Sequence, residues 1–207
     1  MGEISVCKDL AGLASIKQPG TELAIWERSL APMLQNWIEK TDTNNLPDVR
    51  ILVKPDELHL ALDPLLDSCG LRPGNMRTQL IEDIHLLVVS FAAVTSSSLV
   101  DVRLERISHD TCWKFHRDCV ETRLITTYRG PTTEWVRNGH GDQAIKEQKK
   151  FQGPLERLGD NDVAVFKGSA AHPNRGIVHR SPPISGTGLT RLLLCLNQQT
   201  DTSPDPW

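Results

Sequence analysis

Three residues of the kind that bind transition metals define one pattern in this chain. His116 and Asp118 lie two positions apart, and His179 follows much later. Two histidines and one carboxylate can hold a metal at three adjacent positions and leave the opposite positions open for chemistry. Side chains two apart in an extended strand point to the same face, so one strand can supply His116 and Asp118. The third ligand must then come from a second strand, and the pattern predicts a reactive metal centre in a β-structure.

A fourth residue, Arg191, follows His179 within the apolar run at residues 190–196. We expect this run to be a strand that directs the Arg191 side chain inward. A guanidinium pairs two-pronged with a carboxylate and stays charged when buried. Arg191 is therefore interpreted as an anchor for a carboxylate, which belongs either to a ligand or to one of the protein's own acids.

The C-terminal half has the composition of short strands separated by turns. Residues 99–107 alternate between apolar and polar, residues 122–128 are rich in β-branched and aromatic side chains, and residues 163–166 form a short apolar run. Gly130-Pro131 and Pro182-Pro183 end two of the runs, because proline cannot donate a hydrogen bond to a sheet. These features favour a jelly-roll or cupin-like barrel over residues 99–197.

Two sets of motifs carry a resemblance to known families. The first set is Trp113-Lys-Phe-His-Arg-Asp118, Arg123-Leu-Ile-Thr-Thr-Tyr128, Gly159-Asp160 with residues 163–166, Gly176-Ile-Val-His179, and Thr190-Arg191. It resembles the double-stranded β-helix core of the iron(II)- and 2-oxoglutarate-dependent dioxygenases. The second set is Phe115-His-Arg-Asp118, Thr127-Tyr-Arg-Gly-Pro131, Thr133-Glu-Trp135 and His179-Arg-Ser-Pro-Pro183. Through it the whole chain resembles a bacterial family catalogued as a domain of unknown function.

The dioxygenase resemblance implies a role for each matching residue. It implies that iron(II) is held by the catalytic residues His116, Asp118 and His179. It also implies that Arg191 pairs with the distal carboxylate of 2-oxoglutarate, and that Tyr128 and Arg123 belong to the same co-substrate pocket. The implied activity is an oxidoreductase that converts 2-oxoglutarate to succinate and carbon dioxide while it hydroxylates a small-molecule or protein substrate that the sequence does not identify.

Length and charge indicate one enzyme-sized domain. The chain has 207 residues and a formal net charge of −3, which provides no basic field for nucleic acid, so no nucleic-acid partner is expected. The N-terminus lacks the basic and apolar regions of a signal peptide, and the apolar run around residues 84–94 is too short to cross a bilayer. A cytoplasmic protein without a membrane partner is expected.

The N-terminal half has helical periodicity. Residues 22–40, 56–69 and 78–94 carry apolar stripes at helical spacing, and the stripe of Trp26, Leu30, Leu34 and Trp37 is expected to pack against the outside of the sheet. The predicted fold is α+β, with residues 1–98 as mainly helical support, residues 99–197 as the β-barrel with the metal site, and residues 198–207 as a polar tail that extends away unless Trp207 docks.

Two other functions stay open at this point. The same three ligands, joined by Cys112 or Cys119, would form a closed zinc site in a non-enzymatic metal-binding or metal-homeostasis protein. Alternatively, a cupin-type metalloenzyme would use the metal without 2-oxoglutarate, and Arg191 would bind an acidic substrate or serve structure. The insertion at residues 137–161, with a short helix near residues 144–151, is either a substrate loop or a solvated connection.

Overall fold

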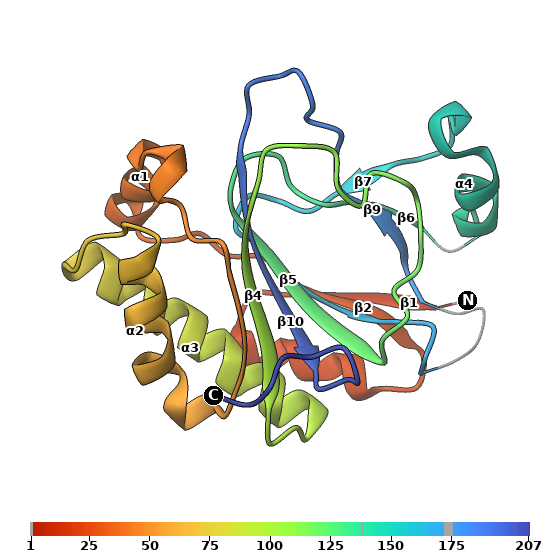
Figure 1. Ribbon diagram of the computed structural model, residues 1–207. Helices are drawn as coiled ribbons and strands as arrows, with labels where there is room; N and C mark the ends of the chain where they lie inside the picture. Colours follow the sequence, from red (N-terminus) through yellow and green to blue (C-terminus); the bar gives the residue numbers. More distant parts are fainter. Residues whose placement is uncertain (1, 138, 172–175) are drawn as a thin grey trace.

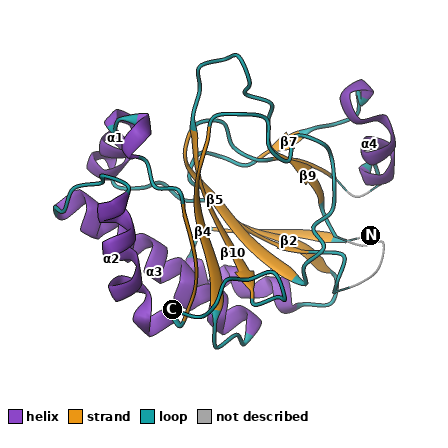
Figure 2. Ribbon diagram, in the orientation of Figure 1, coloured by secondary structure: helices purple, strands orange, loops and turns teal. Residues whose placement is uncertain are grey.

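The protein consists of two β-sheets and a layer of helices on the outer face of the larger sheet (Figures 1 and 2). The structure is a computed structural model that describes residues 2–137, 139–171 and 176–207. The larger sheet has the strand order β1-β2-β8-β5-β10-β4-β3, and its strands are β1 (Glu3–Cys7), β2 (Thr21–Trp26), β3 (Val49–Val53), β4 (Val100–Ile107), β5 (Thr122–Arg129), β8 (Val163–Lys167) and β10 (Arg191–Gln198). The smaller sheet has the order β7-β6-β9, with β6 (Glu134–Val136), β7 (Glu156–Arg157) and β9 (Val178–Arg180). The chain is thus mixed α+β with a large, mainly antiparallel sheet.

Alternation along the central strands separates two cores. On β10, Leu192, Leu194 and Leu196 pack into the core beneath the helices, whereas Leu193 and Cys195 belong to the core between the two sheets. The antiparallel register pairs Leu194 with Leu104 of β4, so the two strands keep their faces in step. A central strand buried on both faces explains the unbroken apolar run in this part of the sequence.

Three helices form the outer layer: α1 (Pro32–Lys40), α2 (Leu58–Ser68) and α3 (Asn75–Thr95). The helices predicted over residues 56–69 and 78–94 are confirmed by α2 and α3. In the described part of the chain, α3 alone has the length and apolar composition of a membrane span. Its buried positions, including Ile84, Leu87 and Phe91, lie in the core beneath the helices. Packing on the sheet accounts for these positions, whereas Leu86 and Val89 of the same helix are exposed.

The expectation that residues 1–98 are mainly helical support is wrong in part, because β1, β2 and β3 also come from this half and join the larger sheet. The helix predicted over residues 22–40 begins only at Pro32, since β2 occupies its first part. Leu23 and Ile25 face the core between the sheets while Ala24 faces the helices. A short strand buried on both faces shows no alternation and is easily mistaken for a buried helix.

The predicted stripe is accordingly divided between two elements. Leu34 on α1 is buried, and Trp37 is partly buried against the core beneath the helices, as expected. Trp26, however, lies at the end of β2, and Leu30 lies in the connection to α1. Pro32 stands in the first turn of α1, where its missing N–H has no intrahelical role, and so it starts the helix and does not kink it.

The smaller sheet packs across the larger one. Trp135 of β6 lies in the same core as Ile125 of β5 and Phe166 of β8. The insertion that follows β6 contains α4 (Gly141–Glu147) and a short 3-10 turn at Gln148–Lys150, slightly earlier than the helix predicted near residues 144–151. The sequence Asn174-Arg175-Gly176 predicts a turn before the strand that carries His179, and the first two of these residues fall outside the described residues.

The C-terminal tail does not extend away from the protein. The backbone N–H of Trp207 donates to the Leu52 carbonyl at 2.9 Å, and Pro206 forms a parallel bridge with Leu52. The Trp207 side chain itself stays about half exposed. Because β3 is the edge strand of the sheet, its outer backbone groups need partners, and the tail supplies some of them.

Candidate metal centre

Two short extended segments bring the two histidines side by side. The His116 N–H donates to the His179 carbonyl at 3.1 Å, and the His179 N–H donates back to His116 at 3.0 Å. His179 lies on β9, whereas His116 lies in the connection between β4 and β5 and makes only this isolated bridge. The predicted strand around His116 is therefore reduced to one ladder pair. That pair is enough to place the ring centroids 4.6 Å apart.

The donor atoms of three residues converge at this point. Nε2 of His116 lies 3.7 Å from Asp118 Oδ1, and Nε2 of His179 lies 3.5 Å from Asp118 Oδ2. One donor atom from each residue lies within 4.8 Å of the others. The structure thus brings together the three residues that the sequence pattern singles out.

Backbone carbonyls orient both imidazole rings. Nδ1 of His116 lies 2.8 Å from the Lys114 carbonyl, and Nδ1 of His179 lies 3.1 Å from the Ile177 carbonyl. A carbonyl can only accept, so each Nδ1 carries the proton and each Nε2 presents its lone pair. Metal-binding histidines are commonly oriented in this way, by a hydrogen bond from the ring nitrogen that does not bind the metal.

Asp118 has one carboxylate oxygen engaged and one free. Oδ1 accepts a hydrogen bond from Arg123 Nη1 at 2.5 Å, and Arg123 is held in turn by Asn197 Oδ1 at 2.7 Å. Oδ2 is buried and has no hydrogen-bond partner among the described residues. A buried carboxylate oxygen without a partner is costly, and a cation bound between the two Nε2 atoms would satisfy it. The donor set therefore fits a divalent transition metal.

Burial also keeps His179 in the form that binds metal. Its ring stacks on Phe166 with centroids 4.9 Å apart. Burial lowers the pKa of His179 and outweighs the opposing effect of Asp118. A neutral imidazole is the form that can donate its Nε2 lone pair to a metal.

The described residues offer three ligands at this point and no fourth. No other histidine, cysteine, aspartate or glutamate that the structure describes joins the group. Cys112 lines the adjoining cavity next to His116, and Cys119 is exposed. A closed structural zinc site uses four protein ligands, whereas three leave positions open for other molecules.

Arg191 is a buried cation with no acidic side chain within ion-pair distance in the described residues, and the charges of Glu105 and Glu134 act on it only from farther away. Its side chain is fully buried at the start of β10. Nε donates to the Pro131 carbonyl at 2.7 Å, Nη1 donates to Ser181 Oγ at 2.7 Å, and Nη2 lies 3.5 Å from Thr133 Oγ1. All three partners are neutral. Burial lowers the pKa of Arg191 to about 10, so the guanidinium is still charged at neutral pH.

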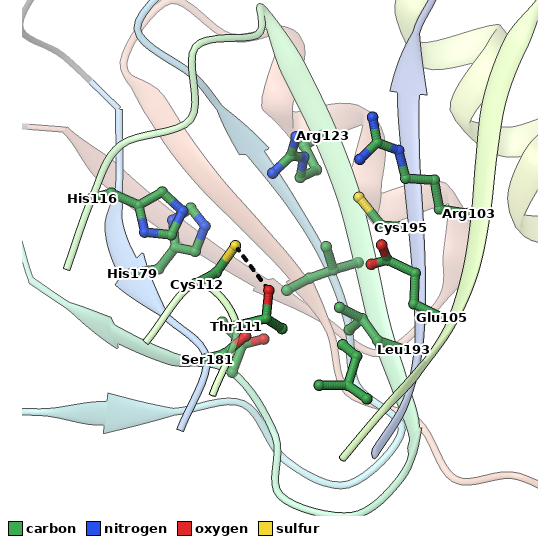
Figure 3. Close-up of a pocket in the computed structure, with 13 residues that line it drawn as sticks. Arg103, Glu105, Thr111, Cys112, His116, Arg123, His179, Ser181, Leu193 and Cys195 are labelled. Atoms are coloured by element: carbon green, nitrogen blue, oxygen red, sulfur yellow. Dashed lines mark hydrogen bonds between the residues drawn. The ribbon is translucent and has the colours of Figure 1, made fainter. Parts of the chain in front are cut away.

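A cavity of about 220 Å³ is lined by both histidines and by Arg123, whereas Asp118 and Arg191 lie behind its wall (Figure 3). His116 and His179 lie side by side at one end, and Arg103, Glu105 and Cys195 stand on the opposite wall. Ser181 and Thr133, the hydroxyl partners of Arg191, also line the cavity. The metal ligands and the neighbourhood of Arg191 are therefore parts of one site.

Comparison with protein families gives one match, which covers residues 7–197 and is described as "Protein of unknown function (DUF1826)". The chain belongs to the DUF1826 family. No curated protein matches it. The match extends over the N-terminal strands and helices as well as the metal centre, so the DUF1826 unit includes both layers of the fold.

Several solved structures are similar in coarse fold to this DUF1826 protein. A Pseudomonas putida prolyl-4-hydroxylase is 9% identical, with a TM-score of 0.47 over 92% of this chain and 99% of that chain. The Kdo hydroxylase KdoO, a non-heme Fe(II) alphaketoglutarate dependent dioxygenase, is 12% identical, with a TM-score of 0.46 over 95% and 89%. A putative oxygenase from Shewanella oneidensis is 13% identical, with a TM-score of 0.41 over 95% and 90%. Identities and TM-scores this low do not support an activity for the DUF1826 protein, so its chemistry must be argued from its own side chains.

The two weaker pocket candidates lie on opposite faces of β5. Arg123 lines the cavity. Tyr128 does not, because its ring lies in the core beneath the helices and its hydroxyl donates to Asp83 Oδ2 of α3 at 2.6 Å. The expectation for Tyr128 is corrected for a simple reason: the two residues are an odd number of positions apart, and side chains alternate along a strand.

Four residues of the site escaped the sequence analysis. Ser181 and Thr133 bond to Arg191, and Arg103 and Glu105 form the cavity wall on β4. Ser181 stands two residues after His179, on the same face of the segment, which was a usable signal. Residues 99–107 alternate between apolar and polar as expected for a strand, and on the polar face of β4 the charged side chains of Arg103 and Glu105 point into the cavity.

Proposed function

We propose that this DUF1826 protein is an iron(II)- and 2-oxoglutarate-dependent oxygenase that hydroxylates a substrate in the cavity beside His116 and His179. The observation that carries the proposal is the fully buried Arg191, which has no acidic side chain within ion-pair distance among the described residues and whose hydroxyl partners Ser181 and Thr133 line that cavity. A buried guanidinium without an anion is unfavourable, so a carboxylate-bearing ligand is the natural partner.

Each residue then has a defined task. His116, Asp118 and His179 would hold the iron, and Arg123 would keep Asp118 Oδ1 occupied so that Oδ2 faces the metal. Arg191, with Ser181, would receive the distal carboxylate of 2-oxoglutarate. Bound iron(II) would supply the activation of dioxygen, which these side chains cannot perform. The protein's own part is to bind, orient and enclose the reactants.

The decisive experiment separates binding of the co-substrate from binding of the metal. The apoprotein is titrated anaerobically with iron(II) and then with 2-oxoglutarate, and the metal-to-ligand charge-transfer absorption is followed. Arg191→Met should weaken 2-oxoglutarate binding by roughly 10- to 100-fold, the effect of losing a charged hydrogen-bond partner, while iron(II) binding persists. Arg191→Lys keeps the charge and should fall between the wild type and Arg191→Met.

Arg129→Met is the matched control. Arg129 lies on β5 and donates to the Ile38 and Thr41 carbonyls, away from the cavity. Its loss should leave the 2-oxoglutarate titration unchanged. Wild-type protein that binds iron(II) but shows no absorption change and no heat with 2-oxoglutarate would overturn the proposal.

A zinc-binding protein is the second candidate, because Cys112 lines the cavity next to His116. In that case zinc(II) should bind far more tightly than iron(II), and Cys112→Ser should weaken zinc binding as strongly as His116→Ala does. A cupin-type enzyme without 2-oxoglutarate would instead bind iron(II) and ignore the co-substrate in the same titration.

A further inference from the structure

Two side chains of opposite charge stand next to each other on the cavity wall. Arg103 and Glu105 lie two positions apart on β4, and both line the cavity, whereas Val102 and Leu104 between and beside them face the helices. Residues two apart on a strand are separated by roughly 7 Å at their Cα atoms. The wall therefore presents one cation and one anion at the spacing of a small molecule (Figure 3).

Neither charge has a hydrogen bond from the described protein side chains, and Arg103 has only a long ion pair with Asp101. No residue in the described part of the chain forms a hydrogen bond or an ion pair with the Glu105 carboxylate, although Glu105 is half-buried. Arg103 Nε is buried without a hydrogen-bond partner, and its nearest acid, Asp101, is 3.7 Å away. Asp101 is already bound by Arg50 through two hydrogen bonds. Half-buried charges without partners are unfavourable unless a ligand completes them.

The surroundings of the pair point to a ligand with both charges. On the neighbouring strand β10, Cys195 is the register partner of Arg103 and Leu193 that of Glu105. Arg191 stands two residues before Leu193, so the proposed co-substrate carboxylate would bind near Glu105. Two carboxylates side by side repel each other unless a cation lies between them. An ammonium group on the substrate would provide that cation.

The size of the cavity restricts the ligand further. Its volume of about 220 Å³ is below the roughly 300–1,000 Å³ of pockets that hold drug-sized ligands, and in the proposed function the ligand would share this space with 2-oxoglutarate. Ile107, Ile125 and Leu193 supply apolar lining next to the two charges. The space thus suits a small molecule that has one anionic group, one cationic group and an aliphatic part.

We propose that the substrate of this cavity is a free α-amino acid, with its carboxylate bound by Arg103, its ammonium group bound by Glu105 and its side chain against Ile125 and Leu193. The inference that the amino acid is oxidised rests on the proposed function. Its binding does not, because Arg103 and Glu105 are not metal ligands.

The test uses the full-length protein without added metal or 2-oxoglutarate. Binding of the twenty free L-amino acids is measured by calorimetry, and each amino acid that binds is compared with two derivatives. The amino acid amide lacks the carboxylate, and the N-acetyl amino acid lacks the ammonium group. The free form should bind at least about 10-fold more tightly than either derivative, since each lost charge removes a charge-assisted hydrogen bond.

Three variants assign the two charges. In Glu105→Gln, the free amino acid and its N-acetyl derivative should bind equally weakly. In Arg103→Gln, the free amino acid and its amide should bind equally weakly. Arg106→Gln is the matched control, because Arg106 lies on the same strand but bonds to the Thr43 and Asn44 carbonyls outside the cavity. It should bind like the wild type.

The proposal is overturned if no free amino acid binds, if the blocked derivatives bind as well as the free form, or if Arg103→Gln weakens 2-oxoglutarate binding as much as Arg191→Met does. Failure of the proposed function gives a different result. In that case an amino acid binds with the predicted dependence on Arg103 and Glu105 but does not stimulate 2-oxoglutarate consumption in the iron-loaded protein. Consumption of 2-oxoglutarate without any amino acid binding supports the oxygenase and overturns the substrate assignment.

Discussion

At the scale of single residues, the centre depends on which atoms are already occupied. In both histidines, Nδ1 is hydrogen-bonded to a backbone carbonyl, and Oδ1 of Asp118 accepts a hydrogen bond from Arg123. What remains is one lone pair on each imidazole and one carboxylate oxygen, all directed at the same point. The preorganised set explains why three residues can suffice for metal binding, because little side-chain freedom is lost when the metal arrives.

Replacement of one histidine should therefore empty the site without unfolding the protein. We expect His116→Ala and His179→Ala each to lower metal affinity by more than the roughly 10- to 100-fold that loss of an outer hydrogen-bond partner causes. Metal content is measured by elemental analysis after identical loading, and circular dichroism checks the fold. His140→Ala, which changes a histidine at the start of α4 outside the cluster, is the control. Full occupancy in both variants would contradict the ligand assignment.

At the scale of elements, the free edge of the larger sheet is closed by ion pairs and by the tail. Asp101 on β4 accepts two hydrogen bonds from Arg50 on β3 and one from Ser203 in the tail. Burial of Asp101 would raise its pKa, but these hydrogen bonds and the nearby Arg103 outweigh burial and lower it. One carboxylate thus joins two strands and the C-terminal segment.

This network predicts a pH-dependent effect of Asp101→Asn. Since the pKa of Asp101 is lower in the folded state than its ordinary value of 3.8, the ionised form stabilises the fold above that value. The contribution is lost as the pH falls from about 4 through the folded pKa. At pH 7 we expect Asp101→Asn to lower the free energy of unfolding by about 1–3 kcal/mol, the range for hydrogen bonds to a charged group, because Asp101 is buried but Arg50 is partly exposed.

Denaturant melts at several pH values check this prediction. The difference between wild type and Asp101→Asn should narrow steadily below about pH 4, because the wild-type carboxyl then becomes neutral too. Asp56→Asn, at an exposed position before α2, should show no such difference. A gap that stays constant down to about pH 2 would mean that the ionised Asp101 is not what stabilises the edge.

At the scale of the whole molecule, the centre joins parts that are otherwise held by the core between the sheets. His179 belongs to the smaller sheet, Asp118 lies in the connection to the larger one, and Arg123 anchors that connection on β5. A bound metal therefore links both sheets. Without the metal, the connection between β4 and β5 is held by fewer interactions, and the backbone bridge between His116 and His179 is one of those that remain.

Metal binding should accordingly stabilise the whole fold. A ligand that binds only the folded state adds about 2.7 kcal/mol at one hundred times its Kd. For a protein of this size we expect Tm to rise by roughly 5–10 °C on addition of iron(II) under anaerobic conditions. Scanning calorimetry with and without chelator measures the shift. The shift should be absent in His179→Ala, and an equal shift in that variant would place the stabilising metal elsewhere.

The sequence by itself determined the features that follow from local periodicity. The spacing of His116 and Asp118 and the positions of α2, α3, β4, β5, β8 and β10 could all be read from apolar patterns, and their α+β combination followed. The odd number of positions between Arg123 and Tyr128 also predicts that their side chains lie on opposite faces of β5, because side chains alternate in any strand. Such information is local, since a few neighbouring residues fix which face a side chain occupies.

Only the tertiary structure decided what depends on pairing between distant segments. It placed β2 next to β8 and β3 next to β4, although the sequence of residues 22–26 is compatible with either a helix or a strand. It brought Ser181 and Thr133 to Arg191 and left that cation with no acidic side chain within ion-pair distance among the described residues. It also turned Arg103 and Glu105 toward the cavity. The physical reason is that burial and hydrogen-bond partners are properties of a contact between elements, and a one-dimensional pattern does not specify which elements meet.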